Sequence, residues 1–290
     1  MTGNGQSQAQ DKVNRLAMRI IRTWDELMAV REAMPGRAAL VPTMGALHNG
    51  HLALVEAAQR EYAGVLASIF VNPTQFSTAE VAASYPRDEE NDFRKLEGAG
   101  CDAVWLPSVG TIYTPGDATT IDPAGPALHW EGTHRPGHFR GMATVVAKLF
   151  GLARPDAAFF GEKDWQQLQV VRRMVADLAL PVRIVGVETV READGLAMSS
   201  RNRLLDVRQR AAAPLLFACL QQVAGDLRSG MPADTALEAG RTRLEQGNLG
   251  VDYLALVDGA TLLPISDFVA GRLIAAVRLG PVRLLDNIAV

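Results

Sequence analysis

Two histidines three residues apart, His48 and His51, are the side chains of this sequence best suited to chemistry. They stand in Val41–His51, between a short apolar run typical of a buried strand and an amphipathic stretch typical of a helix. A helix beginning here would offer unpaired backbone N–H groups and the positive end of its dipole to an anion. Gly45 and Gly50 allow the backbone to approach a ligand closely. The segment predicts a phosphate site, although a plain strand-to-helix turn with two surface histidines fits it equally well.

A second group of polar side chains comes later in the chain. Gly161–Asp164 directly follows an apolar run, and a polar strip with a basic end covers Leu196–Arg203. Nucleotidyl transfer needs positioning and cations near developing charge more than covalent help. We therefore expect the two histidines to contact phosphate oxygens from one side, with Mg²⁺ bridging those oxygens. The opposing contacts to the β and γ phosphates would come from Lys163, Ser199, Ser200 and Arg201.

Each of these features also has a simpler interpretation. Lys163 and Asp164 alone favour a solvated surface pair, and Ser199–Asn202 alone favours a helix cap and turn. The histidines could bind a metal, but no Cys, Asp or Glu joins them in the motif, so we expect no protein metal site. Gln75 and Gln167 are ordinary surface residues unless they lie at the ligand edge, where neutral amides suit a small hydroxy acid.

Strand and helix patterns alternate along the first two thirds of the chain, which predicts an α/β fold: a parallel sheet with helices on both faces. Ligands of such sheets bind beyond the carboxyl ends of the strands. The polar turns 43–51, 72–75 and 161–164 would meet there. Residues 108–137 are rich in Pro, Gly and Thr and are expected to be a long loop. The expected strands are 38–41, 64–71, 102–107, 156–160 and 182–187, and the expected helices are 24–30, 52–58, 88–97, 142–152 and 165–178.

The pattern changes from Arg191 onward. Two helices, 207–227 and 233–245, precede short strands at 251–257, 273–277 and 282–285. We expect a disordered tail over 1–18, a ligand-binding domain over 19–190 and a smaller C-terminal α+β domain over 191–290. The last of these would carry Ser199–Arg201 against the ligand edge and close as a lid.

Composition narrows the class of partner. The net charge of −3 indicates no polyanion partner such as DNA or RNA. Cys101 and Cys219 are far apart and belong to no Cys-x-x-Cys pair, which fits a reducing compartment. No apolar run approaches the roughly 18 residues of a membrane span, and residues 1–11 lack the apolar core of a signal peptide. We expect a cytoplasmic protein with small-molecule partners and no membrane contact.

Eight segments, in order and at close spacing, resemble the pantoate–β-alanine ligase family of Rossmann-like nucleotidyltransferases. The His-x-Gly-His motif alone indicates the superfamily, whereas Asn-Pro-x-Gln-Phe together with Gly-Glu-Lys-Asp-x-Gln-Gln is far more specific. The matching segments cover nearly everything after the tail. They are Pro42–His51, Val71–Phe76, Tyr85–Arg87, Arg135–Phe139, Phe160–Gln167, Asp194–Asn202, Val251–Tyr253 and Arg283–Asn287.

The resemblance implies a two-step reaction and a set of site residues, and it also implies a homodimer. ATP and pantoate would give an enzyme-bound pantoyl adenylate and pyrophosphate, and the amine of β-alanine would then release pantothenate and AMP. His51 would be the proton donor, His48 its partner, and Lys163 would stabilise charge at the transferring phosphate. Gln75 and Gln167 would hold pantoate, and Gln75 would also meet β-alanine. The implied ATP-binding residues are Met44, Gly45, Ala46, Leu47, His48, Asn49, Gly50, His51, Gly161, Glu162, Lys163, Asp164, Val190, Met198, Ser199, Ser200 and Arg201.

The chain departs from the family pattern at a few positions. Trp165 stands where Tyr is usual, and Glu188 replaces Pro two residues before Val190. Asn91 stands where relatives can have Asp, which leaves Asp92 as a weak candidate ligand of Mg²⁺. Two other interpretations stay open: a different nucleotidyltransferase that shares only the histidine motif, and a silent nucleotide-binding protein. A dehydrogenase is disfavoured because no Gly-x-Gly-x-x-Gly follows the first strand.

Overall fold

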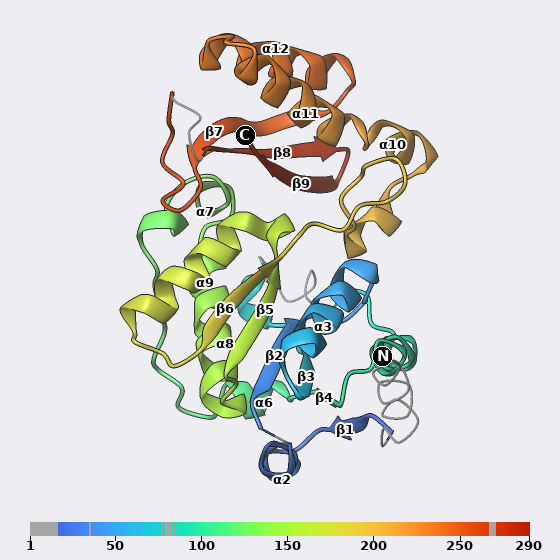
Figure 1. Cartoon of the computed structure of the whole chain (residues 1–290), viewed down its shortest axis with the longest axis vertical. Coiled ribbons are helices and arrows are strands. Elements are labelled where there is room, and N and C mark those ends of the chain that lie inside the picture. Colours follow the sequence, from blue (N-terminus) through green and yellow to red (C-terminus); the bar gives the residue numbers. More distant parts are fainter. Residues whose placement is uncertain (1–16, 35, 77, 79–82, 84, 267–270) are drawn as a thin grey trace, which may run out of the picture.

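The computed structural model describes residues 17–34, 36–76, 78, 83, 85–266 and 271–290. A six-stranded parallel sheet forms its first part, with strand order β1-β4-β3-β2-β5-β6 (Figure 1). From β2 the chain adds β3 and β4 on one side and then β5 and β6 on the other, so the direction of the connections reverses between β2 and β5, while β1 lies at the edge beside β4. Its strands are β1 (Arg19–Ile21), β2 (Ala38–Thr43), β3 (Gly64–Ile69), β4 (Ala103–Trp105), β5 (Ala157–Gly161) and β6 (Arg183–Val187).

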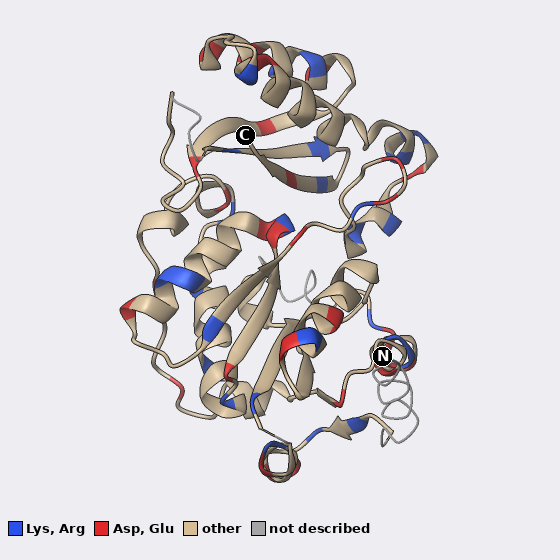
Figure 2. Ribbon diagram, in the orientation of Figure 1, with Lys and Arg blue, Asp and Glu red and all other residues tan. Residues whose placement is uncertain are grey.

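Alternation along the strands decides which helix each side chain meets. Leu40 of β2 packs with the core of α2 (Trp24–Ala33), α8 (His138–Ala153) and α9 (Trp165–Asp177). Its neighbours Ala39 and Val41 pack with α3 (Asn49–Glu61) and α5 (Glu89–Gly98) on the other face. The strands β2, β3 and β5 carry no charged side chain, so they are drawn in tan in Figure 2. The predicted parallel sheet with helices on both faces is confirmed.

The structure differs from the sequence-based expectations in three places. Strand β1 was not predicted, because it is three residues long and only Ile21 is buried. The expected loop over 108–137 contains α6 (Val109–Ile112), η3 (Gly125–Ala127) and α7 (Glu131–His134). The expected helix 207–227 is divided near Pro214 into α10 (Val207–Ala212) and α11 (Leu215–Arg228), because proline cannot donate a helix-interior hydrogen bond. The remaining short helices are η2 (Pro73–Gln75), η4 (Glu162–Asp164) and η5 (Ser200–Leu204).

An antiparallel sheet, β7-β8-β9, forms the C-terminal part. Leu254 and Leu256 pack against the core that includes α11 and α12 (Ala233–Gln246). Tyr253 and Ala255 face the other way and pack against two tryptophans of the first part, Trp130 and Trp165. One face of the small sheet thus forms the junction between the two parts. The strands are β7 (Gly250–Asp258), β8 (Gly271–Leu279) and β9 (Val282–Ala289).

Several expectations concern segments or properties that the structure describes only in part. Residues 1–16 of the expected disordered tail lie outside the described residues, and the division at residue 191 stays a prediction. Cys101 and Cys219 are both buried. Among the described residues, no helix is long and apolar enough to cross a membrane.

Candidate active site

The β2–α3 turn shows why two histidines stand three residues apart. His48 is the N-cap of α3, and its Nδ1 accepts a hydrogen bond from Gly50 N at 3.2 Å. His51, three positions later, returns the bond: its Nδ1 accepts from His48 N at 3.3 Å. This is a capping box built from imidazoles, with ring centroids 4.1 Å apart. Helix capping therefore accounts for the spacing of the two histidines.

The caps also fix the protonation of both rings. Since each Nδ1 accepts a backbone N–H, each neutral ring carries its proton on Nε2. Burial, and then the charge of the nearby Lys163, lower the pKa of His48 to about 4. Burial and the adjacent His48 lower the pKa of His51 to about 3. Near neutral pH both histidines are uncharged donors through Nε2–H.

Asp92 of α5 braces the turn from behind. Its carboxylate accepts hydrogen bonds from Ala46 N and Leu47 N, both at 2.8 Å, and only 2% of Asp92 is exposed. The bonds hold Gly45 and Ala46 at φ values of 80° and 52°, the left-handed region that an alanine rarely occupies. Both carboxylate oxygens of Asp92 thus accept backbone hydrogen bonds. The backbone N–H groups of Ala46 and Leu47, two of the residues expected to bind ATP, are used in these bonds.

The η4 turn carries the lysine of the site. Lys163 Nζ lies 3.6 Å from Asp164 Oδ1. Burial raises the pKa of Asp164, but Lys163 and then Arg201 and Arg135 outweigh it and hold that pKa below its ordinary value. The backbone of the turn is held from the other sheet, because Asn287 of β9 donates to Glu162 O and Lys163 O, both at 2.9 Å. The Glu162 side chain points to the junction, where it meets Arg272 at 3.2 Å.

The polar strip that begins at Ser199 is both a helix cap and a cavity wall. Ser199 is the N-cap of η5, and its Oγ accepts from Arg201 N at 3.2 Å. Ser200 Oγ lies 3.4 Å from the hydroxyl of Tyr85. The simpler interpretation of this strip as a cap is thus correct for Ser199, and it does not exclude a place at the site.

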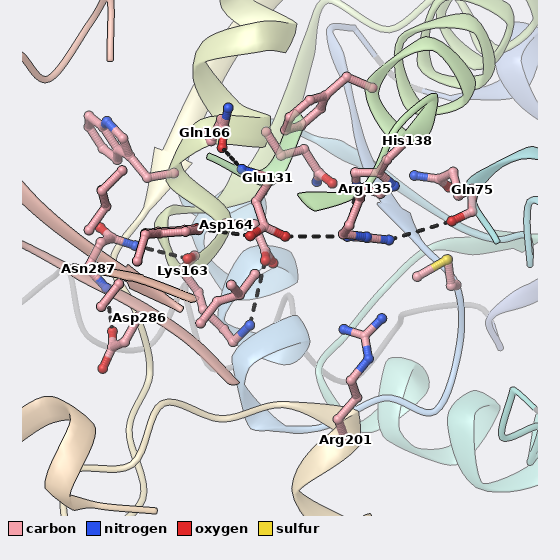
Figure 3. A pocket seen from close by; sticks show the side chains of 18 of the residues that line it. Gln75, Glu131, Arg135, His138, Lys163, Asp164, Gln166, Arg201, Asp286 and Asn287 are labelled. Atoms are coloured by element: carbon pink, nitrogen blue, oxygen red, sulfur yellow. Dashed lines mark hydrogen bonds and ion pairs between the residues drawn. The ribbon is translucent and has the colours of Figure 1, made fainter. Parts of the chain in front are cut away.

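Two cavities adjoin at the carboxyl edge of the parallel sheet. The first, called here the histidine cavity, is lined by His48, Gly50, His51, Gly161, Lys163, Asp164, Gln167, Glu188, Val190, Met198, Ser199, Ser200 and Arg201, among others. The second, the glutamine cavity, is lined by Gln75, Glu131, Arg135, His138, Gln166, Gln167, Tyr253 and Asn287, among others (Figure 3). Met44, Lys163, Asp164, Gln167 and Arg201 line both.

The structure therefore brings most of the sequence-predicted residues together and leaves some outside. Gly45, Ala46, Leu47, Asn49 and Glu162 do not line either cavity. Ala46 and Leu47 face Asp92, Glu162 faces Arg272, and Asn49 is exposed on the first turn of α3. Within the part of the chain that the structure describes, no group of three His, Cys, Asp or Glu residues is placed to hold a metal ion.

Sequence reasoning assigned no role to one wall of the glutamine cavity. Glu131 and Arg135 come from the segment expected to be a loop, and Tyr253 comes from the C-terminal sheet. Arg283, also from that sheet, contacts Glu131 but does not line the cavity. Gln166 positions that segment, because its Oε1 accepts from Glu131 N at 3.0 Å and its Nε2 donates to two carbonyls of the same excursion. Arg135, Tyr253 and Arg283 lie in motifs that match the family, which was the available signal.

A parallel sheet whose histidine-capped helix and lysine turn share one cavity is the arrangement of a Rossmann-like nucleotidyltransferase. The sequence matches the family model Pantoate-beta-alanine ligase over residues 19–289. A pantothenate synthetase of Acidiphilium cryptum is 58% identical over 278 residues, covering 94% of this chain and all of that protein. The chain belongs to the pantoate-beta-alanine ligase family, which confirms the resemblance found in the motifs.

Solved structures of the same family are similar to this one over most of the chain. The crystal structure of pantothenate synthetase from Thermus thermophilus superposes with a TM-score of 0.89 at 50% identity, covering 94% of this chain and 99% of that one. A pantoate-beta-alanine ligase from Francisella tularensis, complexed with beta-gamma ATP and beta-alanine, gives a TM-score of 0.81 at 32% identity over 94% of this chain and 98% of that one.

Proposed function

We propose that this chain condenses pantoate with β-alanine at the expense of ATP, giving pantothenate, AMP and pyrophosphate through a bound pantoyl adenylate. Family membership supports the reaction as a whole. The observation that carries the two-step route is that the histidine and glutamine cavities adjoin and share Lys163, Asp164 and Gln167. An adenylate formed at one cavity is thus already within reach of an amine in the other.

In the first step, a carboxylate oxygen of pantoate attacks the α-phosphorus, and pyrophosphate leaves. His48 and His51 would donate Nε2–H bonds to phosphate oxygens, while Lys163, Ser199, Ser200 and Arg201 would meet charge from the opposite wall. A bound triphosphate raises the pKa of a nearby imidazole because it favours the charged form. Bound ATP would therefore raise the pKa of His51, so that its ring can carry a proton and donate it to the departing oxygen.

In the second step, the β-alanine amine attacks the acyl carbon of the adenylate, the acyl–phosphate bond breaks and AMP leaves with the electron pair. Gln75 and Gln167 would hold the pantoyl group through neutral amide donors and acceptors. The adenylate is prone to hydrolysis, so water must be excluded until the amine arrives. The C-terminal part carrying Ser199–Arg201 would close over the site as a lid.

Three further points belong to the proposal. Mg²⁺ would accompany ATP and be held mainly by the phosphates, since both oxygens of Asp92 already accept backbone N–H groups. The oligomer would be a homodimer, and the protein would act in the cytoplasm on small molecules alone. The unit boundaries of 19–190 and 191–290 complete the proposed organisation.

Product identification tests the proposal. Purified protein with ATP, Mg²⁺, pantoate and β-alanine should form pantothenate, AMP and pyrophosphate in equal amounts, and omission of any substrate should abolish pantothenate. Pyrophosphate release triggered by a different acceptor would favour another nucleotidyltransferase. Binding of ATP without pyrophosphate release in the presence of pantoate would favour a silent nucleotide-binding protein. Either result would overturn the proposed reaction.

A further inference from the structure

The wall of the glutamine cavity contains a charge network that the two-step reaction does not explain. Glu131, which is 5% exposed, accepts from the Tyr253 hydroxyl at 2.9 Å. The guanidinium of Arg283 lies 2.6 Å from each oxygen of the same carboxylate. Arg283 also donates through Nε to Asp252 at 2.5 Å, and Arg278 donates to Asp252 at 2.8 Å. Both carboxylate oxygens of Glu131 thus have close partners other than Arg135.

Arg135 carries the surplus charge of this network. Its Nη1 lies 3.7 Å from Glu131, compared with distances of 2.5–2.8 Å for the other guanidinium–carboxylate contacts. Three guanidinium groups face two carboxylates, so one positive charge is left over, and the loosest partner is the one at the cavity. The Arg135 side chain is only 30% exposed, so this charge is held in partly desolvated surroundings, and this burial lowers the pKa of Arg135. A partly desolvated cation whose ion pair is as long as 3.7 Å is primed to bind a further anion.

The position of Arg135 is fixed by neutral groups. Nη1 lies 3.1 Å from Nε2 of His138, and Nη2 donates to the backbone carbonyl of Gln75 at 3.5 Å. Burial and then Arg135 lower the pKa of His138 to about 3, so His138 is an uncharged acceptor. Figure 3 shows the guanidinium between Glu131 and Gln75. The side chain is therefore aimed at the region where Gln75 is expected to meet the substrates.

The approach to Arg135 is also electropositive. A third cavity adjoins the glutamine cavity, and both are lined by Gln75, Arg135, His138 and Arg201. Among its described lining residues are four arginines (Arg135, Arg201, Arg278 and Arg283) and no aspartate or glutamate. Such an entrance attracts a small anion and disfavours a small cation.

We propose that Arg135 binds the carboxylate of β-alanine, an assignment that rests on the proposed function and deepens it. In the proposed reaction the carboxylate of pantoate attacks the α-phosphorus, so this carboxylate must lie beside the histidines and Lys163. The β-alanine carboxylate is untouched by the reaction and lies two methylene groups from the attacking amine. It needs a cation that is near Gln75 and separate from the phosphate contacts. Arg283 is paired with Glu131 and Asp252 and does not line the glutamine cavity. Arg201 is expected to contact the triphosphate, which leaves Arg135.

The two half-reactions separate this role from a general one. For Arg135→Gln we expect the KM for β-alanine to rise on the order of 10- to 100-fold, the loss for a charge-assisted hydrogen bond. Pantoate-dependent exchange of pyrophosphate into ATP, which needs no β-alanine, should stay within about twofold of the parent. Exchange at the parent rate also shows that the variant is folded. Arg135→Lys should recover part of the loss, since a point charge replaces the planar fork.

A neutral amine sharpens the test. The parent should use β-alanine far better than 3-aminopropan-1-ol, which has the same amine and no carboxylate, and Arg135→Gln should lose most of that preference. Arg140→Gln is the matched control, because Arg140 is exposed and pairs with Asp122 away from the cavities. An unchanged KM for β-alanine, or a raised KM for pantoate in the exchange assay, would overturn the assignment. If the parent makes no pantothenate at all, the proposed function itself fails.

Discussion

The two walls of the candidate site are built in opposite ways. The histidine wall is local: His48 and His51 cap the helix on which they stand, and their partners lie two or three residues away. The wall of Arg135 is assembled over long separations, since Glu131 meets Tyr253 and Arg283 across 122 and 152 residues of sequence. The local wall presents neutral donors and the assembled wall presents charge. Under the proposed function, secondary structure would place the phosphate contacts of the histidines, and tertiary packing would place the contacts to the second substrate.

Removing the charge of Glu131 should damage the assembled wall most. Glu131→Gln keeps the side-chain shape but leaves Arg283 and Arg135 facing a neutral amide, and breaking a buried pair costs about 3–5 kcal/mol of unfolding free energy. Urea denaturation measures the loss. Glu238→Gln, on an exposed side chain beside Arg241, should stay within about 0.5 kcal/mol. Equal stability of both variants would mean that the network contributes nothing.

Replacing one histidine should break the chemistry of the local wall while keeping its architecture. In His51→Asn the amide oxygen can still accept from His48 N, but the distal N–H is lost. We expect pyrophosphate release to slow by about 10²- to 10³-fold, or about 3–4 kcal/mol. His51→Gln, which restores a distal donor, should be less impaired. The exposed His129→Asn serves as the control, and turnover at the parent rate in His51→Asn would remove His51 from the mechanism.

Acid should weaken the local wall in a defined pH window. The folded-state pKa values of about 4 for His48 and about 3 for His51 lie below the ordinary value of 6.5, so the unfolded chain binds more protons between these limits. Stability is therefore complete above about pH 6.5 and falls as pH decreases, by about 2 kcal/mol per imidazole near pH 5. Urea midpoints across this range measure the slope. The double variant His48→Asn/His51→Asn should flatten it, and His138 accounts for part of what remains.

Restoring the family's usual residue at Trp165 should have the smallest effect. The indole N–H donates to Gly259 O at 2.7 Å, and Arg272 lies 3.3 Å from the ring centroid. Trp165→Tyr keeps an aromatic ring but shortens it, so we expect a loss of about 1 kcal/mol and nearly unchanged turnover. A strong drop in turnover with normal stability would show that the junction tunes the chemistry directly.

Sequence reasoning succeeded where structure is local. The alternation of strand and helix patterns along the chain predicted the parallel sheet. The spacing of Thr23 and Glu26 is that of a capping box, and the structure has one at the start of α2. Reasoning from the residues failed at Arg135 and Glu131, because a Pro- and Gly-rich segment carries no periodicity and its anchors are remote. It also could not show that Asp92 braces Ala46 and Leu47, since an acidic helix start reads as a solvated surface.

The hydrogen bonds of the Asn287 side chain, which join β9 to the η4 turn, bear on how the two parts could move. One side-chain amide of β9 holds two consecutive carbonyls, those of Glu162 and Lys163, and its own oxygen accepts from Arg272 at 2.6 Å. Separating the two sheets at this point would leave several polar groups without hydrogen-bond partners. Each group that stays buried would cost about 1–3 kcal/mol of free energy. If the C-terminal part closes as proposed and keeps these bonds, it would turn about an axis near Asn287. Lys163 would then stay in place while Ser199–Arg201 moved.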